Sequence, residues 1–350
     1  MSNLQIGLAA AGGLVLAVMV GHSAWSSRRS RPKQAENPIP GDGNGDREPS
    51  QVGAGIEPEL DAAAFELAQF PLVPTESKPT LDALIDVIAA IAVEEEVSGE
   101  AAMGAMPATR RAGGKPFFIE GFNELEKRWE APLAGRRYSS FQAGIQMANR
   151  AGALNDIEYS EFVMKAQAFC EAINATPDFP EMREEVARAR ELDQFATEHD
   201  AQLEFLLRAR GAAWSPGYVQ QNASRLGFVA GVIPGRMVAP ASVPGLPPVL
   251  GLSFSTQAAM AEDPNQSAIR ELAISLDVAQ VARSEQAFAR MREVAAMLAQ
   301  NMDGVVTDDK GVALSPEAME QIGAELELLY DRLDERDLSA GSAAARRLFS

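Results

Sequence analysis

Apolar and polar side chains alternate in the stretch IRELAISLDV, residues 269–278. Successive side chains of a β-strand point to opposite faces of the sheet, so this period of two predicts a strand with one buried face. The apolar set, which should face covering helices, consists of Leu272, Ile274, Leu276 and Val278. Ala273 and Ser275 are then left on the open side of the sheet.

The segments around this strand continue the same mixed pattern. Residues 285–301 have apolar side chains at helical spacing, and Ser315-Pro316-Glu317 is typical of a helix start, because Ser caps the first turn and Pro fits it. Between them, Asp308-Asp309-Lys310-Gly311 indicates the turn of a hairpin over residues 304–314. Further strands are predicted at 201–208, 226–233 and 248–256, and a helix at 216–225.

The same order of elements is predicted once before, between residues 81 and 198. Strands are expected at 81–93, 116–122 and 138–148, and helices from Ser98, at 158–175 and at 179–198. Because strand–helix–strand–strand occurs twice, we interpret the body as a duplicated unit. The predicted fold class is α+β, with antiparallel sheet and helices on one face, and the free face is where function is expected.

The N-terminus has the composition of a membrane anchor. Residues 1–27 contain no charged side chain, and the apolar run approaches the ~20 residues that a helix needs to span a bilayer. The basic residues that follow at once are Arg28, Arg29, Arg31 and Lys33. The positive-inside rule then places the N-terminus outside and the rest of the chain in the cytoplasm. The alternative is a cleaved signal peptide, which would need basic residues before the apolar run.

Small residues form a stripe along this predicted membrane helix. They recur every four positions, at Ala9, Gly13, Ala17 and Gly21. Such a stripe lets another helix approach closely, which would give self-association. The alternative is that Ala and Gly are simply common in membrane helices.

Residues 26–80 form the predicted linker. They are rich in Pro and contain the run GDGNGD at residues 41–46, so they cannot bury enough apolar surface to offset chain entropy. A coil of about 50 residues spans ~40 Å, so the body would be held near the membrane and still reach outward. Within this linker, residues 57–70 (EPELDAAAFELAQF) fit either a short helix or a docking segment.

Composition excludes several function classes. The net charge of the 350 residues is −18, which disfavours nucleic-acid binding because phosphate neutralisation supplies most of that affinity. A single cysteine, Cys170, excludes an internal disulfide and every multi-cysteine metal site. It lies in the apolar stripe of a predicted helix and is expected to be a buried thiol. His199, beside two acidic residues, is expected to be a surface residue or a partner of a helix C-terminus, with a catalytic base as the alternative. We identify no catalytic constellation, no metal site and no cofactor site.

Two strings in the C-terminal part carry a family resemblance. Residues 248–255 read PVLGLSFS, and residues 302–309 read MDGVVTDD, with LSPE following at 314–317. They resemble the central strand and the helix–hairpin–helix ending of the ZipA family, over about residues 201–336. ZipA proteins are bacterial division proteins that fasten FtsZ filaments to the inner membrane. The predicted anchor, basic flank and Pro-bearing linker match that architecture in kind.

The resemblance implies a function in septation. Proteins of this family hold the C-terminal tail of FtsZ as a partly helical peptide, in a shallow apolar cleft on the open sheet face, and catalyse no reaction. It also implies a single-pass inner-membrane protein of the divisome, with the N-terminus in the periplasm and the C-terminal domain in the cytoplasm.

By position, the resemblance implies a set of partner-binding residues: Val229, Gly231, Leu252, Phe254, Ala273 and Ser275. For the third strand the alternative set is Gly251, Ser253 and Ser255, because a register error of one residue exchanges the two faces. Small residues on the open side would make the floor of a groove that suits a docking helix.

The expected organisation has five parts: an anchor at 1–25, a flexible linker at 26–80, an additional α+β half at 81–199, the FtsZ-binding domain at 200–338 and a tail at 339–350. The additional half and the short linker depart from the family pattern. They leave open the alternative of a membrane-anchored enzyme or small-ligand binder with a site between the two halves. A scaffold that assembles through the stripe of small residues is a third possibility.

Overall fold

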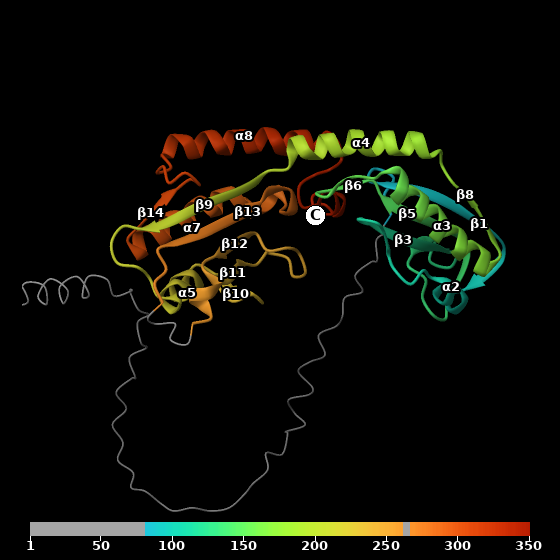
Figure 1. Cartoon of the computed structure of the whole chain (residues 1–350), viewed down its shortest axis with the longest axis horizontal. Helices are drawn as coiled ribbons and strands as arrows, with labels where there is room; N and C mark the ends of the chain where they lie inside the picture. The colour runs from blue at the N-terminus through green and yellow to red at the C-terminus, as the bar shows by residue number, and fades with distance from the viewer. Residues whose placement is uncertain (1–80, 262–266) are drawn as a thin grey trace, which may run out of the picture. The chain divides into compact units, whose positions relative to one another are not determined.

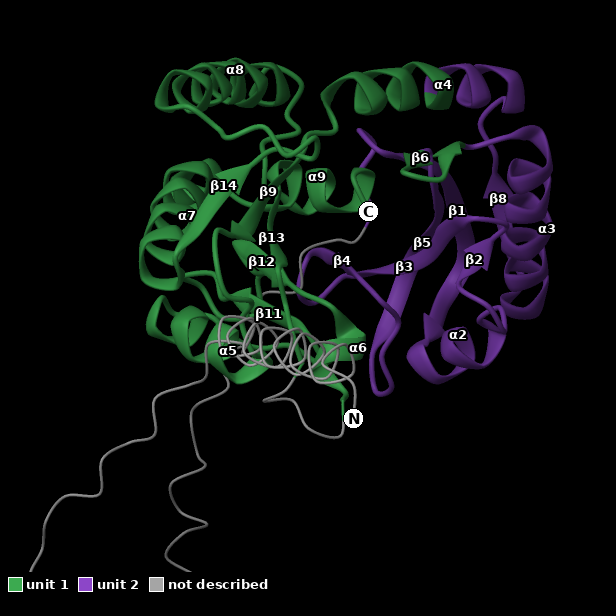
Figure 2. Cartoon of the chain, turned by 60° about the vertical axis from the view of Figure 1, so that its left-hand side comes forward, with its two compact units in different colours: residues 1–36, 148–153, 189–350 green, residues 37–147, 154–188 purple. Residues whose placement is uncertain are grey.

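The computed structural model describes residues 81–261 and 267–350. It consists of helices and antiparallel sheets, which confirms the α+β class. The chain divides into two compact units (Figure 2): of the described residues, unit 2 comprises 81–147 and 154–188, and unit 1 the remainder. The predicted anchor and linker lie outside the described residues. Within the described part, none of the helices has the length and apolarity needed to span a membrane.

Unit 2 is built on a six-stranded antiparallel sheet. Its elements are β1 (Asp86–Ser98), α2 (Gly99–Ala105), β2 (Arg111–Ala112), β3 (Lys115–Asn123), β4 (Arg128–Glu130), β5 (Arg137–Gln146), α3 (Asp156–Ile173), β8 (Ala175–Asp178) and the beginning of α4 (Met182–His199). The strand order is β2-β3-β5-β1-β8, with β4 also paired to β3. Helices α2 and α3 contact each other and the sheet (Figure 1).

Aromatic side chains fill the core between this sheet and α3. Phe117 of β3 packs edge-on against Phe162, with ring centroids 5.8 Å apart, and Phe141 of β5 packs against Phe169 at 5.5 Å. A capping box at Asn155 starts α3, and a left-handed residue, Asn174, ends it. These interactions hold the helix across the buried face of the sheet.

Unit 1 contains the second large sheet. Its elements are β6 (Ala148–Asn149), β7 (Gly152–Ala153), the remainder of α4, β9 (Gln202–Ala209), α5 (Pro216–Arg225), β10 (Val229–Ala230), β11 (Arg236–Ala239), β12 (Leu250–Ser253), α6 (Thr256–Ala259), β13 (Glu271–Asp277), the short 3-10 helices η3 (Val278–Gln280) and η4 (Arg283–Glu285), α7 (Ala287–Met302), β14 (Gly304–Thr307), α8 (Pro316–Asp334) and α9 (Ala343–Leu348). The sheet order is β10-β11-β12-β13-β9-β14, all antiparallel.

The alternation predicted for residues 269–278 is confirmed. Leu272, Ile274 and Leu276 are at most 2% exposed, on the face that α7 covers. Ala273 is partly exposed and Ser275 is exposed, so they lie on the opposite, open face. Strand β13 therefore separates the core of unit 1 from a free surface.

Two strand predictions need correction, and one strand was missed. The strand expected at 226–233 shrinks to β10, because Gly227 has a φ of +85° and the backbone turns there. Strand β11 was not predicted, since its four residues lie between Gly235 and Pro240 and are too few for a visible alternation. In place of the hairpin expected at 304–314, β14 pairs with β9. The second strand expected for that hairpin is reduced to a single bridge between Thr307 and Ala313.

Two further predictions differ from the structure: the strand expected from residue 81 and the tail expected at 339–350. Residues 81–85 form a turn before β1, because the N–H groups of Ile85 and Asp86 both donate to the Asp82 carbonyl. At the other end, α9 places Phe349 in the core at 1% exposed, and Gln280 donates to the Phe349 carbonyl at 2.8 Å. Residues 339–350 are thus part of unit 1.

Candidate partner-binding face

The open face of the unit 1 sheet is arranged in two rows across the strands. Directly paired residues of antiparallel strands place their side chains on the same face. The first row is Val229, Val238, Gly251, Ser275 and Glu204. The second row is Arg236, Ser253, Ala273, Leu206 and Thr307. Small residues therefore occupy the centre of the face, on β12 and β13.

Gly251 keeps the floor of this face low. A Cβ added at Gly251 would lie 2.6 Å from the Ser275 Oγ, closer than real Cβ contacts allow. Any larger side chain would displace Ser275 or fill the surface above it. The centre can therefore accept the backbone or a side chain of a partner.

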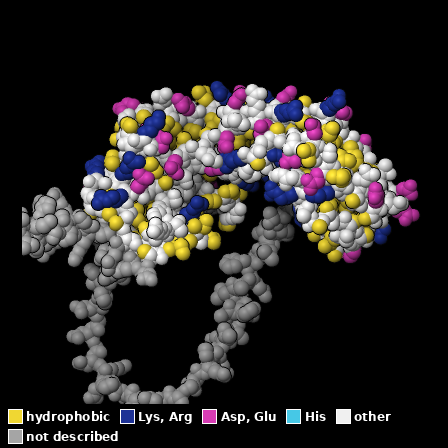
Figure 3. All heavy atoms as spheres, in the orientation of Figure 1, with side chains coloured by type: hydrophobic (Ala, Val, Ile, Leu, Met, Phe, Trp, Pro, Cys, Tyr) yellow, Lys and Arg dark blue, Asp and Glu magenta, His cyan; other side chains and the backbone are white. Residues whose placement is uncertain are grey.

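The two ends of the face differ in polarity. At the β10 end, Val229 is 52% exposed, and Val232 and Ile233 in the following loop are also exposed. Figure 3 shows hydrophobic side chains gathered along the lower margin of unit 1, where Figure 1 places β10 and β11. At the β9 end, Arg208 and Glu271 form an exposed ion pair at 2.7 Å. A partner with one apolar side and a polar end would match this gradient.

The structure brings three of the predicted contact residues onto this face. Val229 and Ser275 belong to the first row, and Ala273 to the second. Gly231 follows β10, and its N–H donates to the Arg236 carbonyl at 2.9 Å, so it holds the edge of the β10–β11 hairpin.

The other two predicted residues lie on the covered side of the sheet. Leu252 is 1% exposed and Phe254 is 8% exposed, because β12 points its even-numbered side chains at the helices. Neither can reach a partner that docks on the open face. The open positions of β12 are Gly251 and Ser253, members of the alternative set that the register left undecided.

A hollow in unit 1 lies on the helix side and had no counterpart in the sequence analysis. It measures about 690 Å³ and is lined by α7, β14 and the start of α8. Its lining includes the apolar side chains of Ala296, Val306 and Met319 and the basic side chains of Arg210 and Arg292. Alanines on the outward side of α7 were the only sequence signal of this groove. It is a rival docking position on the same unit.

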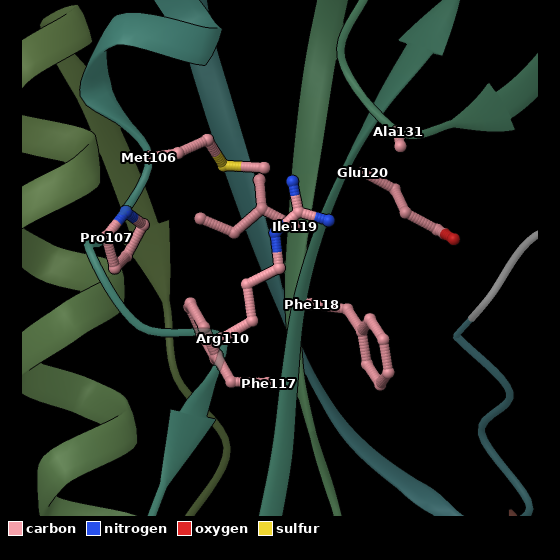
Figure 4. Close-up of a pocket in the computed structure, with 8 residues that line it drawn as sticks. All are labelled: Met106, Pro107, Arg110, Phe117, Phe118, Ile119, Glu120 and Ala131. Carbon is pink, nitrogen blue, oxygen red and sulfur yellow. The ribbon is translucent and has the colours of Figure 1, made fainter.

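Unit 2 has a small cavity beside β3. It holds about 120 Å³ and is lined by residues that include Met106, Arg110, Phe118 and Glu120 (Figure 4). A cavity of that size is well below the ~300 Å³ of a typical small-molecule site. Among the described residues, no group of three or more His, Cys, Asp or Glu side chains is placed to hold a metal ion.

Cys170 is in the core of unit 2, as the sequence predicted. It is 1% exposed on α3, and burial raises the pKa of its thiol to about 11. The thiol therefore stays protonated near neutral pH and is a poor nucleophile. His199 is partly exposed at the end of α4 and stacks on Phe195, with ring centroids 4.1 Å apart.

The comparisons with known proteins identify a family for part of unit 1. Residues 259–325 match the family model described as ZipA, C-terminal FtsZ-binding domain. The matched range contains β13, α7, β14 and the first half of α8. The predicted resemblance to the ZipA family is thereby confirmed.

The other comparisons do not indicate a fold or a function. The curated proteins contain no match to this chain. Among solved structures, berberine bridge enzyme from Eschscholzia californica is similar at 9% identity and a TM-score of 0.15, over 75% of this chain. The chain covers about half of that enzyme, 52% of its length. A TM-score this low says nothing about fold or function.

Proposed function

We propose that this protein tethers the bacterial division ring to the inner membrane and binds the C-terminal tail of FtsZ on the open sheet face of unit 1. The observation that carries the proposal is the family match, described as FtsZ-binding, over residues that include β13. The open positions of that strand, Ala273 and Ser275, form the centre of the face.

The geometry of the face supports a helical peptide as the ligand. An amphipathic helix binds a groove by placing its apolar side on a low floor between raised edges. Gly251, Ser253 and Ala273 supply the floor, and exposed Val229 supplies an apolar edge. The net charge of −18 favours a tail that carries basic residues and discourages contact with anionic lipid.

The tethering part of the proposal rests on the sequence. Residues 1–25 have the composition of a membrane helix, and the basic residues after them favour a cytoplasmic body. The protein would then be a single-pass inner-membrane component of the divisome. A test is alkaline extraction of membranes, in which an anchored chain stays with the bilayer and a chain cleaved near residue 27 is released.

A peptide titration tests the binding site. The full chain in detergent micelles is titrated into a fluorescently labelled peptide of the FtsZ C-terminal tail, and anisotropy is recorded. A saturable signal with a micromolar Kd, or ~8 kcal/mol, is expected for a small peptide groove. Ala273→Arg should weaken binding at least tenfold, because it raises a charged side chain from the floor.

A matched variant distinguishes the open sheet face from the hollow on the helix side of unit 1. Ala296→Arg places the same side chain in the groove between α7 and β14, where Ala296 is exposed. It should leave the Kd unchanged. Loss of binding in Ala296→Arg with normal binding in Ala273→Arg would move the site to the helix side. An absence of binding by the folded wild-type chain would refute the proposed partner.

A further inference from the structure

Leu81 lies on the open face of the unit 2 sheet. A Cβ added at Gly144 of β5 would lie 2.3 Å from Leu81 Cδ2 and 3.0 Å from Cδ1, so the leucine side chain stands directly on this glycine. Leu81 is only 6% exposed, and its N–H donates to Glu120 Oε1 of β3 at 3.3 Å. Both its side chain and its backbone are therefore held to the sheet.

The strand register shows that this contact is on the face opposite the helices. Gly144 pairs with Ile88 of β1 and Phe118 of β3, and these three residues form one row across the sheet. The intervening residues Val87 and Ile145 are fully buried on the other face. Figure 4 shows Phe118 and Glu120 extending to one side of β3, and Met106 and Arg110 lying on the other.

Partly exposed apolar side chains lie beside Leu81. Ile88 and Phe118, at the two ends of its row, are only partly covered. In the next row, Ala90 of β1 is exposed, and Gln142 hydrogen-bonds Glu120 at 2.8 Å. The face therefore offers apolar contacts on both sides of the point where the chain enters unit 2.

The residues that immediately precede Leu81 have the composition to fill this surface. Residues 70–80 read FPLVPTESKPT, with three apolar side chains and three prolines. Proline favours extended backbone at ~3.1 Å per residue, so eleven residues can cover ~30 Å. Four strands at ~4.8 Å spacing are ~15 Å across, so the segment is long enough to cross the sheet.

We propose that residues 70–80 dock in cis on the open face of unit 2, with Leu81 as the anchored end of the docked segment. The face of unit 2 that corresponds to the partner-binding face of unit 1 is then occupied by the chain itself. The effective length of the linker is also shorter, because its last eleven residues lie against the body. This inference stands whether or not unit 1 binds FtsZ.

Hydrogen–deuterium exchange of the full chain in detergent micelles tests the proposal. The amides between Leu72 and Thr80 should exchange at least tenfold more slowly than their unstructured rates. Leu72→Asp with Val73→Asp removes the apolar contacts without touching the folded unit and should restore the unstructured rates. The matched control, Thr75→Asp with Ser77→Asp, adds the same charge at polar positions and should keep the protection.

A second pair of variants approaches the contact from the sheet. Ala90→Glu places a charge on the open face and should release the segment, whereas Ala101→Glu, at an exposed position of α2, should not. The amides of β1 and β5 report in the same experiment that unit 2 is folded. Unstructured rates in the wild-type segment would overturn the proposal. Protection that falls on dilution would also overturn it, because the occupant would then be a second copy.

Discussion

Unit 2 and unit 1 connect their main strands in the same way. In unit 2, β1 lies between β5 and β8, and in unit 1, β9 lies between β13 and β14. In each unit the central strand comes first in the chain, and a long helix joins its two neighbours. The shared topology supports the interpretation of the body as a duplicated unit.

The long helices of the two units also share part of their burial pattern. Each ends on a non-glycine residue with a left-handed backbone, Asn174 in α3 and Asp303 in α7. Counted back from these residues, four positions are buried in both helices: Tyr159 and Phe288, Phe162 and Met291, Ala166 and Ala295, Phe169 and Leu298. The other buried positions differ between the two helices, such as Cys170 in α3 and Val294 in α7. The match is one of burial and size class more than of residue identity, because a core tolerates exchanges of similar volume.

The open faces are where the two units differ. In unit 2 the face carries the Glu120–Gln142 hydrogen bond, and Leu81 stands on Gly144. In unit 1 the corresponding surface has small side chains at its centre. Among residues 201–261 and 267–350, the atoms found within 4 Å of a Cβ built at Gly251 all belong to Ser275. The open face of unit 2 thus holds Leu81 of its own chain against Gly144, whereas that of unit 1 keeps small side chains at its centre.

The largest expected effect on unfolding free energy comes from replacing one large core side chain with alanine, in one unit at a time. Phe162→Ala in unit 2 removes a ring that contacts Phe117 and Phe179, and should cost about 3–5 kcal/mol of unfolding free energy. Met291→Ala removes the matching side chain of unit 1 and should cost about 2–5 kcal/mol. Hydrogen exchange should show faster opening only in the unit that carries the substitution.

The outcome decides how separate the units are. If Phe162→Ala accelerates exchange equally in residues 81–147 and in residues 201–350, the two units unfold as one cooperative body. The comparison of two independent copies would then hold for topology only.

A smaller effect is expected at the serines that cap α2 in unit 2 and α5 in unit 1. Ser98 accepts from the Ala101 N–H at 3.2 Å, and Ser215 accepts from the Tyr218 N–H at 3.2 Å. Ser215 is fully buried, so its loss leaves an N–H that water reaches poorly. We expect Ser215→Ala to cost about 1–2 kcal/mol and Ser98→Ala about 0.5–1 kcal/mol in urea denaturation.

Replacement by another capping residue provides the control. Ser98→Asn keeps a side-chain acceptor and should retain most of the stability. Equal losses in the two alanine variants would mean that burial of the cap does not matter, and that the units are more alike than their exposures indicate.

Much of the architecture could be predicted because it follows from local chemistry. The helix starts at Ser98 and Ser315 were predicted from their serine caps, and both serines accept a backbone N–H in the structure. The helix predicted at 216–225 also begins after a capping serine, Ser215. The alternation in β13 was long enough to assign its faces. Both kinds of signal depend on side chains close together in the sequence.

The residues that were missed depend on pairing between distant segments. The register of β12 was left undecided, although residues 250–255 alternate between apolar and small or polar side chains. That alternation assigns Leu252 and Phe254 to the buried face, and the pairing with β13 agrees by placing Gly251 and Ser253 outward. Strand β11 was too short for a pattern. The contact of Leu81 with Gly144 joins residues 63 positions apart, and no sequence motif predicts it.

The smallest predicted effect concerns Cys170, which stands where α7 has Ala299 when both helices are counted from their left-handed ends. Burial raises the pKa of the thiol from 9.0 to about 11, because the thiolate loses its hydration in the core. The folded state binds this proton more tightly than the unfolded state. Its contribution to stability is therefore complete below pH 9 and is lost as the pH rises through about 11.

Cys170→Ala makes α3 resemble α7 at this position and removes the titrating group. Its free energy of unfolding should fall less steeply between pH 9 and 11 than that of the wild-type chain, and the tyrosines, which titrate in both proteins, cancel in the difference. Urea denaturation at several pH values measures the two slopes. Parallel slopes, or rapid reaction of the native thiol with a disulfide reagent at pH 8, would show that water reaches Cys170 and that the core of unit 2 opens more readily than its match with unit 1 implies.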